Sequence, residues 1–521
     1  MPLPVIGSQQ RWQWLTPAVA FVLVLVAHDH LAAVIAVLVG AGFLLLIERN
    51  VVAAANALFL GVLFNSVVLP VLFKLGLPAS LVQATSLWKE GVVAGCLVAV
   101  VHRRSWRRPD AIDIAALAYM ALGTLYLLVP VVILGHGFGS SLSLYERGLG
   151  WRSDVFFVVA FLAFRHLHLG RPVVDTIMRR VVVVTSIAAA IGIFEALFSA
   201  AWNRLAVAVL GVTDYRHLVL HQQPSSQFNL KDIRIFELLD GHQVVRIGSV
   251  LFDAIAIGFV FAIGLGIAAE IVARGRPPRW VYASMPVLGA GLLLTQTRSA
   301  IIAGVLATAF ALRHRAGKSL AGRHHLARLL AVVLMVGTPV VVVSGVLNRF
   351  ANDPGANTTH TTSYKKALQI LVDEPLGRGL STGAGGGILL AQQQNTIDTS
   401  TPRVTTESQY LEAGTQLGLA GLAAYLVITV LVIRRLLRRR GEEGVELAPG
   451  AMGNAAVGLA VGALTTQPFV SVEVSLLFWG LAGLAVSIVD DGIDAHRRRP
   501  GEPDRQVRTT STATMRPTSV P

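Results

Sequence analysis

The stretch Leu293–Ala300, LLTQTRSA, separates two apolar segments and carries an arginine in its second half. The segments on either side, 280–295 and 299–312, have the composition of membrane helices, so Arg298 is expected at the rim of the hydrocarbon layer. A guanidinium at that depth is costly without a partner. This stretch therefore indicates both a membrane fold and the position of a functional site.

The composition extends this membrane fold to the whole chain. Of the 521 residues, 54% are hydrophobic and only 14% are charged, whereas a typical soluble domain has about 25% charged residues. The apolar runs lie at 12–27, 31–47, 51–73, 88–101, 111–134, 150–164, 181–200, 248–272, 280–295, 299–312, 328–346, 411–433, 451–467 and 470–489. Because the hairpins at 12–47 and 451–489 could be re-entrant or tilted, we expect an all-α, polytopic membrane protein with about 12–14 transmembrane helices.

Lysine and arginine residues collect on one side of this membrane domain. With a cytoplasmic N-terminus, 29 of the 44 fall in inner loops and termini, as the positive-inside rule requires. The net charge of +14 therefore reflects topology, and no nucleic-acid partner is expected, because the charge lies in short juxtamembrane clusters. The sequence predicts a multi-pass protein with both termini in the cytoplasm.

Several kinds of site have no support in the sequence. The single cysteine, Cys96, excludes an internal disulfide and a cysteine-based metal site. The histidines show no HExxH spacing, and no GxxxxGK[ST] phosphate loop is present. We therefore expect no metal and no cofactor.

The outer side carries segments too long to be simple connectors, at 135–149, 201–247 and 347–410. Residues 202–212 are amphipathic and indicate either an interfacial helix or an ordinary loop helix. In the large loop, a helix is expected at 364–372, and the Gly-rich stretch 383–387 would be a lid hinge or plain flexible loop. The membrane domain is expected to span 1–489, followed by a disordered cytoplasmic tail at 490–521.

Four basic residues, Lys89, Arg152, Arg246 and Arg298, lie at expected outer ends of helices. A lone arginine there commonly snorkels to lipid headgroups. Arg246 and Arg298, however, are expected on antiparallel neighbours, with Arg246 opening the helix 248–272, at an axis separation of roughly 8–10 Å. Two forked donors at one depth suit a diphosphate. Asp253, two turns further along, would orient an arginine or line a wet cleft.

Short motifs occur in a fixed order along the membrane domain. They are WKEG at 88–91, RIGSVLF at 246–252, TQTRSA at 295–300, DEPLGRGL at 373–380 and ESQYL at 407–411, followed by GLAG at 418–421. Each is weak alone. In this order, within a many-helix chain, they resemble the O-antigen ligase and polymerase superfamily of bacterial membrane glycosyltransferases.

The resemblance implies a reaction at the outer face of the bacterial inner (plasma) membrane. The donor would be an undecaprenyl-diphosphate-linked glycan whose diphosphate is held by Arg246 and Arg298, with help from Lys89 or Arg152. The acceptor would be a glycan or glycolipid, bound by the outer loop with Arg378, Arg403 and Tyr410. A chain-length regulator or a flippase would be a partner.

One position departs from the family pattern. Ligases of the family place a His-Asn pair before x-Tyr-Leu, where this chain has Glu407 and Ser408. A glutamate is ionised at neutral pH, so we expect Glu407 to act as the catalytic base beside Arg298. The alternative is that Glu407 caps a helix that starts at about Tyr410.

Two further alternatives remain at this stage. A polymerase and a ligase differ only in their acceptor, and the glutamate in place of histidine favours a polymerase of exopolysaccharide or capsule type. The competing class is a lipid-linked oligosaccharide flippase or other transporter. Inverted repeats and charges deep within several helices would indicate transport; here the charges gather at one outer level and no repeat is visible, which favours the enzyme.

Overall fold

The computed structural model describes residues 42–129, 142–222, 231–239, 242–275, 277–316, 354–383, 406–438 and 446–497. Within these residues, eight helices are long and apolar enough to cross a membrane, at 51–74, 79–102, 111–128, 171–197, 254–273, 409–437, 447–465 and 472–493. The predicted all-α, polytopic membrane fold is therefore confirmed. The expected spans at 12–27 and 328–346, and most of 31–47, lie outside the described residues, so the total helix number stays a prediction.

The elements follow one another along the chain with few interruptions. They are α3 (Val51–Gly61), η1 (Val62–Phe64), α4 (Asn65–Lys74), α5 (Ala79–Ser86), α6 (Trp88–His102), α7 (Ala111–Leu128), α8 (Leu144–Asp154), α9 (Phe156–His166), α10 (Arg171–Leu197), α11 (Ser199–Arg204), η4 (Leu205–Val209), α12 (Val212–Asp214), η5 (Tyr215–Val219), β1 (Ile235–Leu239), β2 (His242–Arg246), η6 (Ser249–Leu251), α13 (Ala254–Ala273), α14 (Arg279–Leu294), α15 (Arg298–Ala316), α18 (Pro354–Asp373), α20 (Gln409–Leu437), α21 (Leu447–Thr465), η7 (Pro468–Val470) and α22 (Val472–Arg497).

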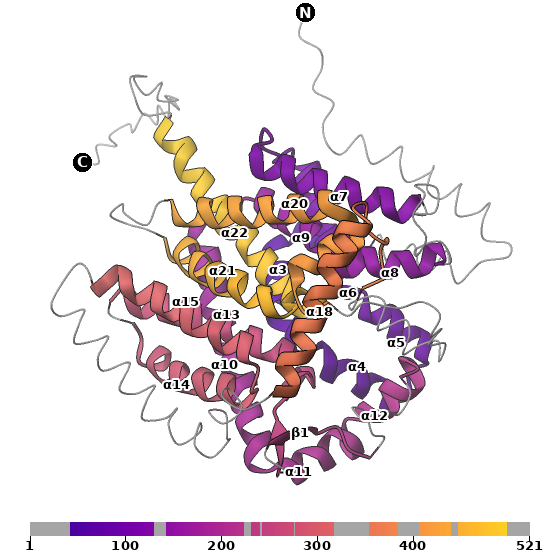
Figure 1. Cartoon of the computed structure of the whole chain (residues 1–521). Helices are drawn as coiled ribbons and strands as arrows, with labels where there is room; N and C mark the ends of the chain where they lie inside the picture. Colours follow the sequence, from indigo (N-terminus) through magenta and orange to yellow (C-terminus); the bar gives the residue numbers. More distant parts are fainter. Residues whose placement is uncertain are drawn as a thin grey trace, which may run out of the picture.

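Helix α13 lies at the centre of the bundle, where it packs against α10, α14, α15 and α21 (Figure 1). Small residues allow the close approach, because a Cβ on Gly266 would lie 3.2 Å from Ala307 Cβ, and one on Gly458 only 2.2 Å from Ala303 O. Such contacts stabilise helix association in a membrane, where lipid tails are as apolar as the side chains. Helix α13, which follows Arg246 in the chain, is therefore surrounded by other helices on most sides.

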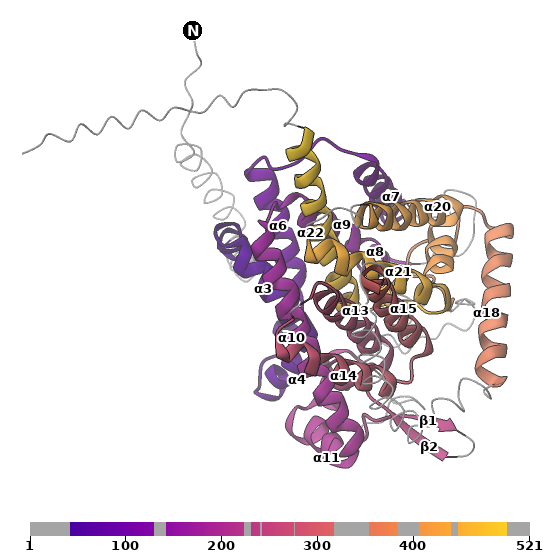
Figure 2. The ribbon, with the colours of Figure 1, turned by 90° about the vertical axis from the view of Figure 1, so that its left-hand side faces the viewer.

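The two ends of the bundle are unlike. Figure 2 shows α11 and the β1–β2 hairpin together at one end, with the C-terminal part of α22 at the opposite end. Helix α18 stands at one side, where it contacts α20 (Figure 2). The hairpin pairs antiparallel, with Ile235 opposite Arg246, in a segment that was expected to be a loop.

Several expected boundaries are wrong. Helix α13 begins at Ala254 instead of 248, because Phe252 has a left-handed φ of 52° and the backbone before it is irregular. The expected span 150–164 is divided between α8 and α9, the outer helix expected at 364–372 is the longer α18, and α22 continues through the first residues of the predicted tail.

A network of buried charges joins four helices at their predicted cytoplasmic ends. Arg165 is 2% exposed, and its guanidinium donates to Asp110 Oδ2 (2.7 Å), Asp113 Oδ1 (2.8 Å) and Asp490 Oδ2 (2.9 Å). Arg435 donates to Asp490 Oδ1 (2.7 Å) and also pairs with Asp110. Burial alone would raise the pKa of Asp110, but the hydrogen bond and charge of Arg165, together with Arg435, lower it to about 2. The network fixes α7, α9, α20 and α22 to one another.

Removal of the central guanidinium from this network should destabilise the protein strongly. We expect Arg165→Leu to lower the free energy of unfolding by about 3–5 kcal/mol, because it leaves buried carboxylates without their counter-charge. Arg171→Leu is the matched control: Arg171 pairs with Glu446 at the start of α10 but is 55% exposed, so a loss below about 1 kcal/mol is expected. Unfolding in detergent would measure both, and equal losses would contradict a central role for Arg165.

Candidate functional site

The turn between α14 and α15 is held by its own hydroxyl groups. Thr295 Oγ1 donates to Leu292 O (2.7 Å) and accepts from Thr297 N (3.2 Å), while Gln296 has a left-handed φ of 54°. These residues are buried, and their local hydrogen bonds satisfy backbone groups that have no helical partner. Arg298 follows as the half-buried first residue of α15.

Arg246, the last residue of β2, contacts this turn directly. Its Nε donates to Thr295 O (3.1 Å) and one NH2 group donates to Thr297 Oγ1 (3.1 Å). The structure therefore places Arg246 on the backbone that leads into Arg298. Arg246 reaches the turn from a strand, however, and not from the first turn of a helix 248–272 as expected.

The backbone between β2 and α13 is anchored from two neighbouring helices. Ile247 N donates to a carbonyl at the end of α14 (3.3 Å), and the buried Glu195 of α10 accepts from Gly248 N (3.1 Å) and Ser249 N (2.6 Å). Asp253 does not lie two turns inside a helix as expected; it is the N-cap of α13 and accepts from the N–H groups of Ile255 and Ala256. These contacts hold the position of Arg246.

A third segment brings Glu407 toward the same turn. Ser299 Oγ and Thr466 Oγ1 are 2.7 Å apart, and Thr466 O accepts from Gln409 N (3.3 Å). Ser299 follows Arg298, and Gln409 lies two residues after Glu407. The turn after α21 thus connects the segment that carries Glu407 to the helix that carries Arg298.

Glu407 itself is half-buried and lies just outside α20. The helix begins at Gln409, one residue before the expected Tyr410, and its N-cap residue is Ser408, which makes no side-chain cap hydrogen bond. Glu407 is therefore not the N-cap residue, contrary to the capping interpretation. Its catalytic role stays a prediction.

The segment 375–379, PLGRG, fills a break in α20. The helix is interrupted at Gly418, with φ 71° and ψ −171°. Thr415 O and Gln416 O accept hydrogen bonds of 2.8 and 2.9 Å from N–H groups of the segment, and Leu419 N donates to one of its carbonyls (2.8 Å). Each chain segment thus satisfies the polar backbone groups of the other, as burial in a membrane protein requires.

Two glycines make this contact possible. Gly377 has φ 77°, and a Cβ added to it would lie 2.4 Å from Gly418 N. A Cβ on Gly418 would lie 2.4 Å from Pro375 O. The glycine of Pro375-Leu376-Gly377 is therefore required by a close backbone approach at a left-handed position.

Gly418→Ala should disrupt this junction. The left-handed φ and the overlap with Pro375 O together should cost about 2 kcal/mol or more of folding stability and displace the loop. Gly289→Ala, in the membrane helix α14 with no atom within 4 Å of the added Cβ, is the control and should leave the melting temperature nearly unchanged. If both variants melted alike in detergent, the proposed fit would be wrong.

Lys89 and Arg152 form a polar group of their own. Lys89 is buried and its Nζ donates to Ser86 O (2.9 Å), while Arg152 Nε donates to Glu90 Oε1 (2.7 Å). Glu90 also lies 3.9 Å from Lys89 Nζ. Among the hydrogen bonds of the described residues, none joins this group to Arg246 or Arg298, so its role in donor binding stays a prediction.

The residues expected to bind the acceptor are dispersed. Arg378 donates to Glu374 Oε1 (2.8 Å), and Tyr410 OH donates to Ala460 O (2.8 Å). Arg403 lies outside the described residues, as does most of the Gly-rich stretch 383–387. Of these three residues, the structure describes only Arg378 and Tyr410, which contact different partners.

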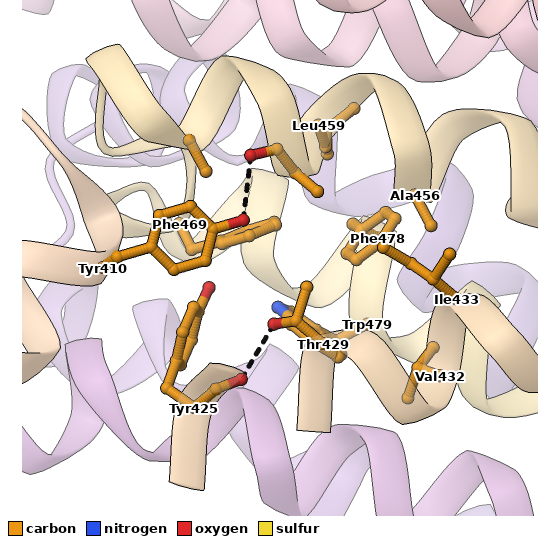
Figure 3. A pocket seen from close by; sticks show the side chains of 12 residues that line it. Tyr410, Tyr425, Thr429, Val432, Ile433, Ala456, Leu459, Phe469, Phe478 and Trp479 are labelled. Atoms are coloured by element: carbon orange, nitrogen blue, oxygen red, sulfur yellow. Dashed lines mark hydrogen bonds between the residues drawn. The ribbon is translucent and has the colours of Figure 1, made fainter. Parts of the chain in front are cut away.

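Tyr410 separates two apolar cavities. The first is an open groove of about 470 Å³ lined by Tyr364, Leu368, Ser408, Tyr410, Leu411, Leu426, Ala460, Val461 and Leu464. The second is a more enclosed pocket of only about 10 Å³ among α20, α21 and α22 (Figure 3), where the rings of Tyr410 and Tyr425 meet edge to face at 5.7 Å. The open groove begins one residue after Glu407.

Sequence analysis missed a polar cluster around Glu412, five residues after Glu407. Glu412 and Gln416 are buried, and Gln416 Nε2 donates to Glu412 Oε1 (2.7 Å). Two polar residues four apart in the first turns of an apolar helix are a signal that could have been used. Thr466 and Gln467, which complete the contacts, carry no such signal in the sequence.

The comparisons with known proteins identify part of this assembly. Residues 283–426 match the family model described as O-antigen ligase. No curated protein matches the chain. The matched region runs from α14 through the 295–298 turn to α20, and so includes Arg298 and Glu407. The match supports a role in glycosyl transfer during O-antigen or polysaccharide assembly.

Proposed function

We propose that this chain, which belongs through residues 283–426 to the O-antigen ligase/polymerase superfamily, transfers a glycan from an undecaprenyl-diphosphate-linked donor to a sugar hydroxyl on the extracytoplasmic side of the membrane. The observation that carries the proposal is the joining of three segments. Arg246 binds the backbone that leads into Arg298, and Thr466 connects the next residue of α15 to the segment of Glu407. Hydrogen bonds thereby connect the segments that carry the two guanidiniums and the carboxylate.

The two arginines would bind the donor diphosphate. The contacts of Arg246 with Thr295 and Thr297 orient its guanidinium. Oriented guanidiniums bind phosphate oxygens through paired N–H groups. They would stabilise the negative charge that develops on the leaving diphosphate, a term that usually contributes most to catalysis.

The open groove beside Tyr410 would hold part of the polyprenyl chain. It is lined almost entirely by apolar side chains from α18, α20 and α21, and it begins at Ser408, next to Glu407. A donor whose lipid lies in this groove would enter laterally from the bilayer. Its diphosphate would then lie near the outer ends of the helices.

Glu407 would act as the base. It would take the proton of the acceptor hydroxyl while that oxygen bonds to the anomeric carbon, and the bond from that carbon to the diphosphate would break with inversion. The donor is already activated by its diphosphate, so the proposed step requires no metal. A glutamate at this position favours a polymerase of exopolysaccharide or capsule type over a ligase, with a chain-length regulator or flippase as partner.

Arg298→Lys tests the diphosphate site. The variant keeps the positive charge but loses the forked geometry, so we expect turnover of a lipid-linked repeat unit in detergent to fall by roughly tenfold to a hundredfold. Arg313→Lys, near the other end of α15, is the control and should retain turnover. Equal activity of Arg298→Lys and wild type would refute bidentate binding.

Glu407→Gln tests the base. The amide cannot accept the proton, so turnover should fall by at least about a hundredfold while the variant still binds donor. Product formation and donor binding should be measured on the same preparation. A variant with full turnover would leave Glu407 without a catalytic role.

A transporter is the competing function, and sealed vesicles would separate the two. Radiolabelled lipid-linked donor and an acceptor would be supplied, and the label would be followed in lipid and in longer glycan. The proposed enzyme forms a new glycosidic bond. Transbilayer movement of label without such a bond would indicate a flippase.

A further inference from the structure

A buried carboxylate lies at the point where the proposed catalytic segments meet. Glu412, in the first turn of α20, is 1% exposed. Its Oε2 accepts from Gln467 Nε2 (3.0 Å) and from Thr406 Oγ1, and its Oε1 accepts from Gln416 Nε2 (2.7 Å). These donors come from three separate positions in the chain, so the carboxylate is fixed in place.

Two of these donors belong to the segments that carry the proposed reacting groups. Thr406 adjoins Glu407 in the chain. Gln467 adjoins Thr466, which is hydrogen-bonded to the residue after Arg298. Gln467 Nε2 also donates to Thr406 Oγ1 (2.7 Å), so the two segments are tied together directly as well as through Glu412.

The outer loop closes over the same carboxylate. Ser381 N donates to Gln416 Oε1 (2.8 Å), which fixes the amide that contacts Glu412. A Cβ added to Gly383 would lie 1.9 Å from Glu412 Oε1, so the loop backbone passes against the carboxylate. Glu412 therefore contacts the loop, the start of α20 and the turn after α21 at once.

A second acid completes the cluster. Asp154, the last residue of the polar helix α8, is 5% exposed, and the side chains of Gln416 and Ser153 lie close enough to act on its carboxylate. The ionisable groups that act on it are Glu412 from α20, Tyr119 from α7 and Tyr425 from α20. Burial and the charge of Glu412 raise the pKa of Asp154 well above its usual range. A charge on one of these two acids therefore disfavours ionisation of the other.

We propose that Glu412 is a positioning residue for glycosyl transfer: its carboxylate ties the segment of Glu407 to the turn 465–467 and so sets the position of the base relative to Arg298. The inference rests on the proposed function, since it assigns Glu412 no contact with substrate. The proposal therefore predicts that removal of the Glu412 hydrogen bonds lowers kcat and leaves donor binding intact.

Three variants cut the tie to different degrees. Thr406→Val removes one donor at nearly constant volume and should lower kcat roughly tenfold, Glu412→Gln should lower it more, and Glu412→Ala roughly a hundredfold or more. KM for the lipid-linked donor should stay within about twofold of wild type. Thr429→Val is the matched control, because this threonine of α20 bonds only to Tyr425 O in its own helix, and it should retain wild-type kcat.

The result of Thr406→Val decides the matter even if Glu412→Ala fails to fold. A kcat equal to that of Thr429→Val would overturn the proposal. So would a rise in donor KM as large as the fall in kcat, because that pattern would make Glu412 part of general substrate binding. Melting temperatures in detergent would be recorded for every variant.

The pH profile gives a readout that a purely structural role would not move. As the pH rises through the raised pKa of Asp154, a second buried charge forms beside Glu412, so wild-type kcat should fall on the alkaline side. Asp154→Asn cannot ionise and should shift this fall to higher pH or remove it. An alkaline limb unchanged by Asp154→Asn would contradict the proposed coupling.

The outcomes for Glu412 and for the function itself are separable. If Arg298→Lys and Glu407→Gln both turned over as wild type, the proposed function would fail, whatever Glu412 did. If those two lost activity while Thr406→Val and the Glu412 variants kept it, only the positioning role would fail. Loss of kcat in all of them, with donor KM retained in the Glu412 variants, supports both.

Discussion

The architecture of the site depends on one constraint: in a membrane, backbone N–H and C=O groups freed by a break in a helix must find partners within the protein. Breaks occur at 295–297, at 247–253 and at Gly418. The first is satisfied by its own threonine hydroxyls and Arg246, the second by Glu195, and the third by the segment 375–379. Hydrogen bonding at these breaks brings together segments that are far apart in the sequence.

Two arginines of the structure have different surroundings. Arg165 is enclosed by Asp110, Asp113 and Asp490, so its charge is compensated and serves to hold helices together. Arg246 donates to a carbonyl and to a hydroxyl of the turn 295–297, and these contacts orient its guanidinium. The first arrangement holds helices together, and the second fixes the direction of a side chain that the proposed function assigns to the donor diphosphate.

The sequence predicted those features that follow from the length of an apolar segment or of a connection between two segments. Apolar length gave most of the helices, and the short connection between α13 and α14 was enough to expect Arg246 near the turn before Arg298. Sequence reasoning failed where backbone direction changed: nothing in RIGSVLF indicated that Arg246 ends a strand or that Asp253 caps a helix that begins later. It also missed Asp154, which reads as an ordinary polar residue until α20 places Glu412 beside it.

Glu407 and Glu412 show how environment separates the roles of two similar side chains. Glu412 is almost fully buried, and hydrogen bonds from Thr406, Gln416 and Gln467 hold its carboxylate in place. Glu407 is half-buried, lies outside the helix and adjoins the open groove. A base must be accessible to its substrate and must be able to change its protonation state. A positioning group has neither requirement. Under the proposed function, the start of α20 would therefore supply both groups, with Glu407 as the reacting carboxylate and Glu412 as the fixed one.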